Sequence, residues 1–542
     1  MHIVVSPGRA RTFEDDGTPL SDEPFSDLSL LVSRREPERP RWVWDDTRRW
    51  YPQLLAAGLR VERCVDLRLT HTILRNSTLT AASALATAPP GSWDDAAELP
   101  VEPRSRGEAL FDLDEPEPLA DTDPVDEWML QRSAVAASSD PRRIGLLLAA
   151  ESAGALIAVE MKYAGLPIDT ATHEHLLVGL LGPRPTHGER PALLEALKQR
   201  LCGILGFDFN PDSPAELLKA LRKAGMQVAS TSKWEIQEIQ HPVIAPLLEY
   251  KRLSRLMTAN GWSWLETWVS DGRFRPEYVP GGVVTGRWAA SGGGALQLPK
   301  QIRGAVIADP GWVFVVADAA QLEPRVLSAL AGDRAMAAAG SGDMYEGIVA
   351  SGAVKTRAEA KVAMLGAMYG ATTGDSGRLV PALAKAFPRA IALVEDAARA
   401  GERGESVTTR LGRSSPLPGI DWRQQSSLGA EAERRARSQS RSWGRFTRNF
   451  VVQGSAAEWA LCWMAGLRGK LWALSDGPFA GRPHLVFFLH DEVIVHTPIE
   501  LAEDVASLVR EAAAEAGRLI FGDLPVTFPV TTATVRTYAE AK

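Results

Sequence analysis

Two aspartates that follow apolar, strand-like runs are the first residues able to carry chemistry. Asp318 comes directly after WVFVVA, and Asp491 lies between the apolar runs 485–489 and 493–496, a pattern that predicts a β-hairpin with carboxylates at its tip. An isolated Asp at such a position is usually a helix cap or turn residue. If the two strands are neighbours, however, the carboxylates converge, and two close anions need a cation between them. Magnesium meets that need, and paired ions promote in-line displacement at phosphorus.

A helix expected over residues 355–369 is the second candidate, because its polar and apolar side chains recur every four residues. The residues of this stripe are Arg357, Lys361, Leu365 and Tyr369. Arg holds phosphate oxygens through two parallel bonds and Lys holds them as a point charge, while the two apolar residues offer a surface for a base and a sugar. Without further context, the same pattern is typical of an amphipathic helix with a solvated basic face.

The two aspartates and the basic helix must be positioned by the rest of the chain, which divides into regions with different hydrophobic patterns. Residues 142–166 favour a helix, and residues 190–270 continue with amphipathic helical periods. Residues 1–92 mix helix-like segments with short strand-like runs at 2–5 and 28–32. A chain of 542 residues is too long for one ordinary core, so we expect several folding units.

The charge balance argues weakly against a nucleic acid partner. The chain has a formal net charge of −7 and a pI of about 5.8. Phosphate contacts depend on local Lys and Arg rather than on the sum. Much of the acidity lies in residues 94–127, a Pro-rich stretch typical of a solvated linker or insertion, whereas residues 434–448 (RRARSQSRSWGRFTR) are basic.

The cysteine positions and the hydropathy of the chain argue against a zinc protein, a disulfide-linked protein and a membrane-spanning protein. Cys64, Cys202 and Cys462 are far apart, so neither a zinc site nor a disulfide framework is indicated, and we expect a reducing cytoplasm. Charged residues or Pro interrupt every apolar run, from which we expect no membrane-spanning segment. The initial MHIVVSPGRARTF lacks the layout of a secretion signal.

Five ordered blocks resemble DNA polymerase family A, the DNA polymerase I family. They are TGRWAASGGGALQLP (285–299), VFVVADAAQLEPRVLSALAGD (313–333), KTRAEAKVAMLGAMYG (355–370), RFTRNFVVQGSAAE (445–458) and FFLHDEVIV (487–495). The second, third and fifth are similar to the family's motifs A, B and C. Similarity upstream, in MKYAGLPID and ASTSKWEIQEI, extends the resemblance from about residue 140 to the C-terminus.

The resemblance implies a template-directed DNA polymerase that adds dNTPs to a primer 3′-hydroxyl by two-metal nucleotidyl transfer. It implies that two Mg2+ ions are held by Asp318, Asp491 and the carbonyl of Ala319, and that Lys361 and Glu492 are also catalytic. The residues implied for nucleotide binding are Arg357, Lys361, Leu365, Tyr369, Gln321 and Glu323. Those implied for contact with primer-template DNA are Arg287, Gln297, Arg445, Asn449, Gln453 and His490.

The implied fold is α+β and multidomain. It is a right-hand polymerase fold, with an antiparallel palm sheet and helical fingers and thumb, preceded by an N-terminal α/β ribonuclease H-like exonuclease remnant. The expected domains are an exonuclease-like domain (1–154), a thumb (155–284), a palm (285–340 and 426–542) and fingers (341–425). We expect a cytoplasmic, nucleoid-associated monomer without a membrane partner, acting in DNA replication or repair.

Several residues depart from the family's pattern. Leu365 stands where the family usually carries Phe or Tyr, a difference that bears on nucleotide selectivity. Ala319 and Ala320 replace the usual Tyr-Ser, Pro324 interrupts the start of the following helix, and the loop after Gln297 is shortened.

The N-terminal region occupies the place of the family's 3′–5′ exonuclease domain. That chemistry needs a strand-borne Asp-x-Glu, and the expected first strand, HIVV, carries no carboxylate. Asp45, Asp46 and Asp66 could be remnants of later motifs, although isolated surface aspartates are the commoner interpretation. We therefore predict a shortened domain without nuclease activity.

Two other functions stay open at this point. A single-subunit RNA polymerase shares the hand-shaped fold, but Glu323 and the HDE hairpin tip oppose it. A catalytically inactive DNA-binding scaffold is compatible with the substitutions after Asp318. The joint retention of five residues opposes it: Asp318, Asp491, Arg357, Lys361 and Tyr369.

Overall fold

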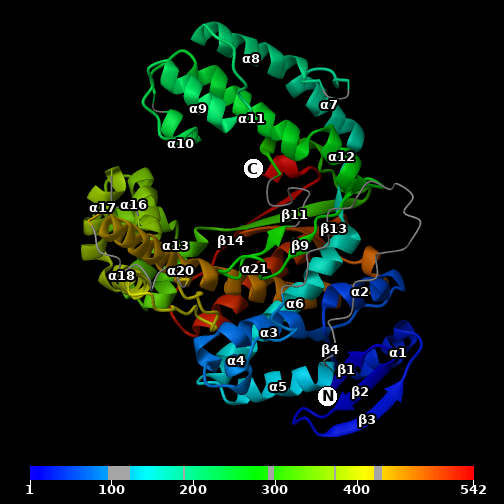
Figure 1. The fold of residues 1–542 in the computed structure, drawn as a ribbon. Helices are drawn as coiled ribbons and strands as arrows, with labels where there is room; N and C mark the ends of the chain where they lie inside the picture. The colour runs from blue at the N-terminus through cyan, green and yellow to red at the C-terminus, as the bar shows by residue number, and fades with distance from the viewer. Residues whose placement is uncertain are drawn as a thin grey trace.

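The computed structural model has the shape of a right hand placed on an additional N-terminal domain (Figure 1). It describes residues 1–95, 123–186, 189–237, 239–290, 298–370, 374–419 and 430–541. A central sheet lies between helical thumb and fingers, and the N-terminal domain lies on the opposite side of the palm from the thumb.

The palm is a four-stranded antiparallel sheet with the order β12-β13-β11-β14. Its strands are β11 (Trp312–Ala319), β12 (His484–Leu489), β13 (Glu492–Pro498) and β14 (Val530–Val535). The expected hairpin is confirmed as β12–β13, with His490 and Asp491 at its turn. The strand expected to end before Asp318 continues through Ala319, because β14 pairs with those last two residues from the other side.

Long helices cover the palm sheet. They are α6 (Pro141–Ala164), α13 (Leu322–Ala331), α20 (Ala430–Ala473) and α21 (Ala502–Phe521). The helix α21 contacts β11, β13 and β14, while α20 and α6 contact β12. The core between them is aromatic as well as aliphatic, since Trp459 and Trp463 of α20 are fully buried. Burial of such large side chains fixes the sheet's face against the helices.

The fingers follow α13 and precede α20 in the chain, and the structure describes five of their helices. They are α14 (Arg334–Ala339), α15 (Met344–Ala350), α16 (Arg357–Tyr369), α17 (Gly374–Ala386) and α18 (Pro388–Glu402). The helix expected over 355–369 is confirmed as α16. It begins at Arg357 because the Thr356 hydroxyl accepts from the Glu359 N–H at 3.1 Å, and the Glu359 carboxylate accepts from the Lys355 N–H at 2.8 Å.

The thumb consists of helices and short strands, as the periodicity after residue 190 predicted. Its helices are α7 (Thr170–Leu181), α8 (Ala192–Leu205), α9 (Pro214–Lys223), α10 (Lys233–Ile236), α11 (Ile244–Asn260) and α12 (Trp262–Trp268). Its short strands are β6 (Leu166–Pro167), β7 (Val269–Ser270) and β8 (Arg273–Phe274), followed by the pair β9 (Tyr278–Val279) and β10 (Ala289–Ala290).

The N-terminal domain is an α/β unit with a five-stranded mixed sheet of order β3-β2-β1-β4-β5. The strands are β1 (His2–Ser6), β2 (Arg9–Phe13), β3 (Pro19–Pro24), β4 (Arg41–Trp44) and β5 (Arg63–Asp66). The helices are α1 (Leu28–Arg35), α2 (Thr47–Ala56), α3 (Leu67–Asn76), α4 (Ala84–Thr87) and α5 (Pro124–Ala136). The strand-like interpretation of residues 28–32 is wrong. The Asp27 side chain caps a helix there, accepting from the Ser29 N–H at 2.7 Å.

Helix α6 corrects the expectation that no segment could cross a membrane. By length and composition alone it is long and apolar enough, and among the described residues it is the one helix that meets this test. In the fold, 72% of its apolar window is buried against the rest of the protein, as in the core helix of a soluble protein. The helix also runs through residue 154, where the exonuclease-like domain was expected to end.

A buried ionic network ties the N-terminal domain to the palm. Arg468 of α20 donates two hydrogen bonds to Glu160 of α6, at 2.9 and 2.6 Å, and two more to the carbonyls of Val61 and Glu62. Tyr51 of α2 donates to the same carboxylate at 2.6 Å. Burial would raise the pKa of Glu160, but the neighbouring arginines outweigh it and hold that pKa below its usual value.

Replacing Arg468 with Met should lower the free energy of unfolding by about 3 kcal/mol, because it leaves a buried carboxylate with one guanidinium fewer. Urea unfolding followed by tryptophan fluorescence measures this. The matched control is Lys470→Met on the same helix, whose partners Glu511 and Glu515 are more exposed, with an expected loss below about 1 kcal/mol. Equal losses for the two variants would show that the network does not hold the domains together.

Candidate active site

Asp318 and Asp491 lie next to each other at one end of the palm sheet. Asp318 is opposite Glu492 in the antiparallel pairing of β11 with β13. The N–H of Ala319 donates to the backbone carbonyl of Asp491 at 2.9 Å, which locks the hairpin turn onto the end of β11. Asp491 follows His490, whose φ of 58° is in the left-handed region required by this tight turn. Two residues separated by more than 170 positions in the chain are thereby adjacent in space.

Glu492, which follows Asp491, is buried and not exposed to solvent. Tyr538, close to the C-terminus, donates a hydrogen bond to the Glu492 carboxylate. Burial together with the nearby carboxylates of Glu492 and Asp318 raises the pKa of Tyr538. The arrangement places Glu492 behind the catalytic end of the sheet, with Tyr538 as a partner that the sequence did not indicate.

The four stripe residues of α16 share one exposed face, as their spacing predicted. Arg357, Lys361, Leu365 and Tyr369 are all exposed, whereas Ala360, Ala363, Met364, Ala367 and Met368 form the buried face. Leu365 is 37% and Tyr369 41% exposed, so two large apolar side chains point away from the core. Exposed apolar residues beside exposed cationic groups suit a ligand that has both a ring and phosphates.

The two ends of this stripe connect to the segment that follows Asp318. Near the helix C-terminus, the Tyr369 hydroxyl donates to Glu323 at 3.1 Å, and Arg287 donates to the other oxygen of that carboxylate. Near the helix N-terminus, Arg357 donates to Asp343 at 2.9 Å, and Gln321 donates to the same oxygen at 2.9 Å. Glu323, which the resemblance implies for nucleotide binding, is therefore hydrogen-bonded to Tyr369, and both ends of the α16 stripe contact residues that follow Asp318 in the chain.

Of the residues expected to contact DNA, Arg287 and His490 line a cavity beside Asp491, and three others lie on α20. Gln453 of α20 accepts from the Thr285 hydroxyl at 3.1 Å, and the amide oxygen of Asn449 is buried without a hydrogen-bond partner among the described residues. Arg445 lies against Gly370, where an added Cβ would come within 2.8 Å of the arginine side chain, so only Gly fits this left-handed helix end. Gln297 lies outside the described residues.

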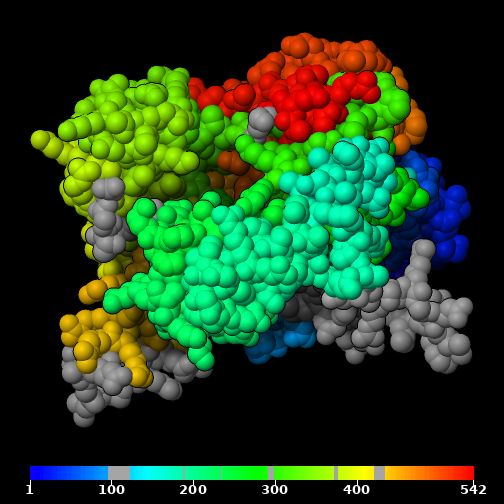
Figure 2. All heavy atoms as spheres, turned by 90° about the horizontal axis from the view of Figure 1, so that it is seen from above, coloured from blue at the N-terminus to red at the C-terminus, as the bar shows by residue number. Residues whose placement is uncertain are grey.

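A cavity of about 80 Å³ opens beside Asp491. Its polar lining comes from Arg287, Glu323, His490 and Asp491, and its apolar lining from palm and α20 side chains. Seen from above, the molecule is hollowed between the fingers, the thumb and the C-terminal segment (Figure 2).

The donor set at the aspartates fits magnesium. Oxygen ligands are what Mg2+ prefers, and it is usually bound by one or two carboxylates with water and substrate phosphates completing the shell. Among the described residues, no group of three or more His, Cys, Asp or Glu side chains is placed to share a metal ion. Asp318 and Asp491 would thus supply only some of the ligands of a metal ion. The role expected for the Ala319 carbonyl stays a prediction.

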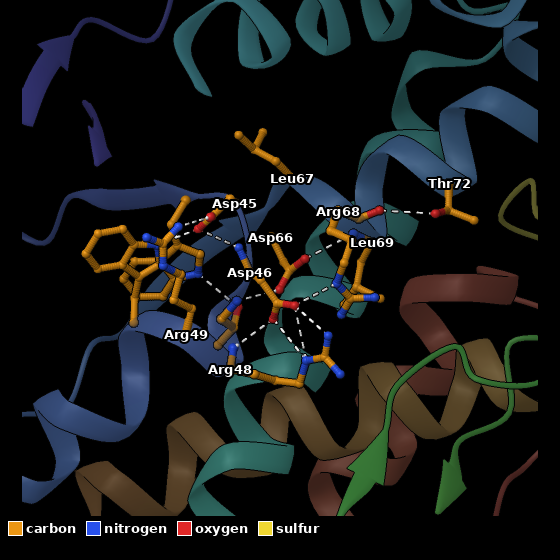
Figure 3. A network of polar contacts seen from close by, with 12 residues as sticks. Asp45, Asp46, Arg48, Arg49, Asp66, Leu67, Arg68, Leu69 and Thr72 are labelled. Carbon is orange, nitrogen blue, oxygen red and sulfur yellow. Dashed lines mark hydrogen bonds and ion pairs between the residues drawn. The ribbon is translucent and has the colours of Figure 1, made fainter. Parts of the chain in front are cut away.

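The three N-terminal aspartates are not isolated surface residues, which corrects that interpretation. Asp45 and Asp66 are buried, and all three carboxylates are held by arginines or by helix N-termini (Figure 3). Asp46 accepts from Arg48 at 2.6 Å and from Arg68 at 2.9 Å, and these two arginines outweigh burial and lower the pKa of Asp46 to about 2.

The other two acids of this cluster are also engaged. Asp45 accepts from Arg49 at 2.8 Å, and Asp66 accepts from the backbone N–H groups of Thr47 at 2.8 Å and Leu69 at 3.0 Å. Guanidinium groups and backbone dipoles thus neutralise carboxylates that would otherwise attract a metal ion.

Comparison with known proteins agrees with this geometry. The family model described as DNA polymerase family A matches residues 187–540. A thermostable DNA polymerase I of Thermus filiformis is 24% identical over 384 residues, covering 62% of this chain and 43% of the relative. DNA polymerase I of Lactococcus lactis is 24% identical over 425 residues, covering 71% of this chain and 45% of the relative. The chain thus spans less than half the length of these curated relatives.

A solved structure has the same fold. The POL domain of Pol1 from M. smegmatis, in complex with DNA primer-template and dNTP, superposes with a TM-score of 0.67 at 17% identity, covering 98% of this chain and 93% of that one. The right-hand architecture is therefore shared along the whole chain, including the N-terminal α/β unit. Because the family model covers well over half of the sequence, the chain belongs to DNA polymerase family A.

Proposed function

We propose that the protein is a template-directed DNA polymerase that adds dNTPs to a primer 3′-hydroxyl. The observation that carries the proposal is the hydrogen bond from the Ala319 N–H to the Asp491 carbonyl, which brings Asp318 and Asp491 to the same end of the palm sheet, while the exposed face of α16 carries Arg357 and Lys361. Carboxylates for metal and cations for phosphate, brought together by distant parts of the chain, are the parts that phosphoryl transfer requires. The relative solved with primer-template and dNTP supports the same substrates.

Each group has a role that follows from its chemistry. Asp318 and Asp491 hold Mg2+, which when bound supplies charge neutralisation at the attacking hydroxyl and at the departing pyrophosphate. Arg357 grips the triphosphate through its fork, and Lys361 neutralises its charge and donates a proton to the pyrophosphate. Tyr369 and Leu365 cover the base and sugar, and Glu323, bonded to the Tyr369 hydroxyl, closes the space that a 2′-hydroxyl would need.

The DNA contacts are of a kind that tolerates any sequence. Arg287, Asn449, Gln453 and His490 lie around the cavity or the adjacent α20 surface, where a primer terminus would sit beside Asp491. Donors at these positions meet the acceptors that all base pairs present in the minor groove, so they read shape and pairing rather than sequence. That behaviour suits an enzyme that must copy any template.

A single-subunit RNA polymerase is the main alternative, and Glu323 argues against it. The carboxylate is fixed by Arg287 and Tyr369 at the position where a ribose hydroxyl would be accommodated. Primer extension with dNTPs and separately with NTPs distinguishes the two enzymes, because preferential use of NTPs would favour the alternative.

The N-terminal domain is proposed to be a structural support without 3′–5′ exonuclease activity. Its first strand lacks carboxylates, and its acidic cluster is paired with arginines. Its link to the palm through Arg468 and Glu160 gives it a structural role. A monomeric state and a role in replication or repair remain predictions. A cytoplasmic location on DNA is also a prediction, and the free Cys64 and Cys462 thiols are in keeping with a reducing compartment.

Replacing Asp318 or Asp491 with Asn should each reduce primer extension by roughly a thousandfold or more, because the loss of one metal-binding carboxylate removes several kcal/mol of charge stabilisation. The measurement is single-nucleotide incorporation on a labelled primer with saturating Mg2+. Asp504→Asn, which alters an exposed carboxylate on α21, is the control and should retain full activity. An Asp491→Asn enzyme with unimpaired extension would refute the proposed site.

The same duplex, with the primer labelled at its 5′ end and incubated with Mg2+ or Mn2+ but without nucleotides, should keep its full length. The expected reason is that Arg48 and Arg68 occupy the carboxylate that a metal would need. Stepwise shortening that disappears in an Asp66→Asn variant would instead assign nuclease activity to the N-terminal domain.

A further inference from the structure

Two side chains that the resemblance implies for nucleotide binding share one acceptor in this structure. Arg357 of α16 and Gln321, which precedes α13, both donate to the Oδ2 atom of Asp343 at 2.9 Å. Lys361, one turn further along α16, is exposed and forms no hydrogen bond or ion pair with any described residue. One phosphate-binding cation is thus held by a carboxylate while its neighbour is not.

Asp343 is firmly placed by the surrounding structure. Its Oδ1 atom caps α15 by accepting from the N–H groups of Tyr345 at 2.9 Å and Glu346 at 3.0 Å. The turn before it is fixed by Arg325, a 1% exposed side chain that donates to the carbonyls of Gly340 and Gly342 at 2.6 Å each. A carboxylate held in this way cannot follow Arg357 when that side chain moves.

Gln321 is equally constrained. Its φ of 49° is in the left-handed region, which is uncommon outside Gly, Asn and Asp. Its amide oxygen accepts from the Met344 N–H and from Arg325, both at 3.3 Å. The strained backbone directs this side chain toward Asp343 immediately after the strand that ends with Asp318 and Ala319. Strain of this kind persists where the surroundings over-determine it, often at functional sites.

The ion pair between Arg357 and Asp343 is accessible enough for another anion to replace the carboxylate. The Arg357 side chain is 49% and the Asp343 side chain 32% exposed, so the pair is accessible to solvent and to an incoming anion. Burial alone would raise the pKa of Asp343, but the hydrogen bond from Arg357 and the helix N–H groups lower it, and the carboxylate is ionised at neutral pH. The guanidinium also lies over the Tyr345 ring, 5.3 Å from its centre, which limits where it can move.

We infer that Asp343 is a positioning residue that holds Arg357 and Gln321 in the nucleotide-free enzyme and is exchanged for the triphosphate when a nucleotide binds. The inference rests on the proposed polymerase function. The carboxylate keeps the arginine oriented beside Lys361, and it competes with the phosphates for the same hydrogen bonds. Nucleotide affinity therefore depends on how much more strongly Arg357 binds the triphosphate than it binds the Asp343 carboxylate.

The test compares Asp343→Asn with the unsubstituted enzyme. Asn keeps the helix cap and the size of the side chain but removes the competing charge. Binding of the matched dNTP to a complex with a dideoxy-terminated primer should become about threefold tighter, the range expected for an exposed ion pair. In steady-state incorporation the KM should fall by a similar factor, with kcat changed less than about twofold.

Two further variants separate this account from general effects. Asp343→Glu keeps the charge and should bind dNTP as the unsubstituted enzyme does. Glu346→Gln removes a carboxylate whose nearest oxygen is 3.9 Å from Arg357 and which does not bond to Gln321, so it should leave the dissociation constant unchanged. Thermal unfolding of each variant checks that the fold is intact.

The outcomes separate cleanly. An active Asp343→Asn enzyme with unchanged or weaker dNTP binding would overturn the inference and leave the proposed function standing, with Asp343 reduced to a helix cap. Equal tightening in Glu346→Gln would overturn it as well, because any nearby negative charge would then suffice. If the unsubstituted enzyme incorporated no dNTP, the proposed function would fail, and the inference with it.

Discussion

Repulsion between two carboxylates is the constraint on which the rest of the structure depends. The pairing of β11 with β13 and the hydrogen bond from Ala319 to Asp491 force two anions to the same end of one sheet, although burial and mutual charge oppose it. Such an arrangement is tolerable only where cations arrive. Arg287 and Arg357 on the surrounding elements are already paired with Glu323 and Asp343, so the proposed function assigns the charge of the two aspartates to metal ions.

The N-terminal domain and the palm differ in how the charge of their carboxylates is balanced. In the N-terminal domain the charge of buried acids is balanced internally, by Arg48 and Arg68 for Asp46 and by helix N–H groups for Asp66. In the palm the proposed function assigns the charge of Asp318 and Asp491 to metal ions, and the molecule is hollowed between thumb and fingers (Figure 2). A closed ionic network stabilises a scaffold, whereas an open one can bind a charged substrate.

Local patterns were enough to predict the palm hairpin, helix α16 and its exposed stripe, because each depends on residues close in sequence. The fold class and the family followed from ordered motifs. Contacts between distant segments could not be predicted. The Tyr538 bond to Glu492 joins the C-terminal segment to the hairpin, and the Asp343 bond to Arg357 depends on how α15 packs beside α16. The pattern of residues 28–32 predicts a strand as readily as a helix, because a five-residue segment with four apolar side chains fits either structure until the Asp27 cap is considered.

Metal binding in the assembled complex tests the central claim most directly. Electron paramagnetic resonance can count the Mn2+ ions bound to a complex of the enzyme with dideoxy-terminated primer-template and matched dNTP. Shared carboxylates at the sheet end predict two bound ions for the unsubstituted enzyme and for Asp504→Asn, and at least one fewer for Asp318→Asn and for Asp491→Asn. An Asp491→Asn complex that binds Mn2+ with the same stoichiometry and affinity as the unsubstituted enzyme would contradict the account.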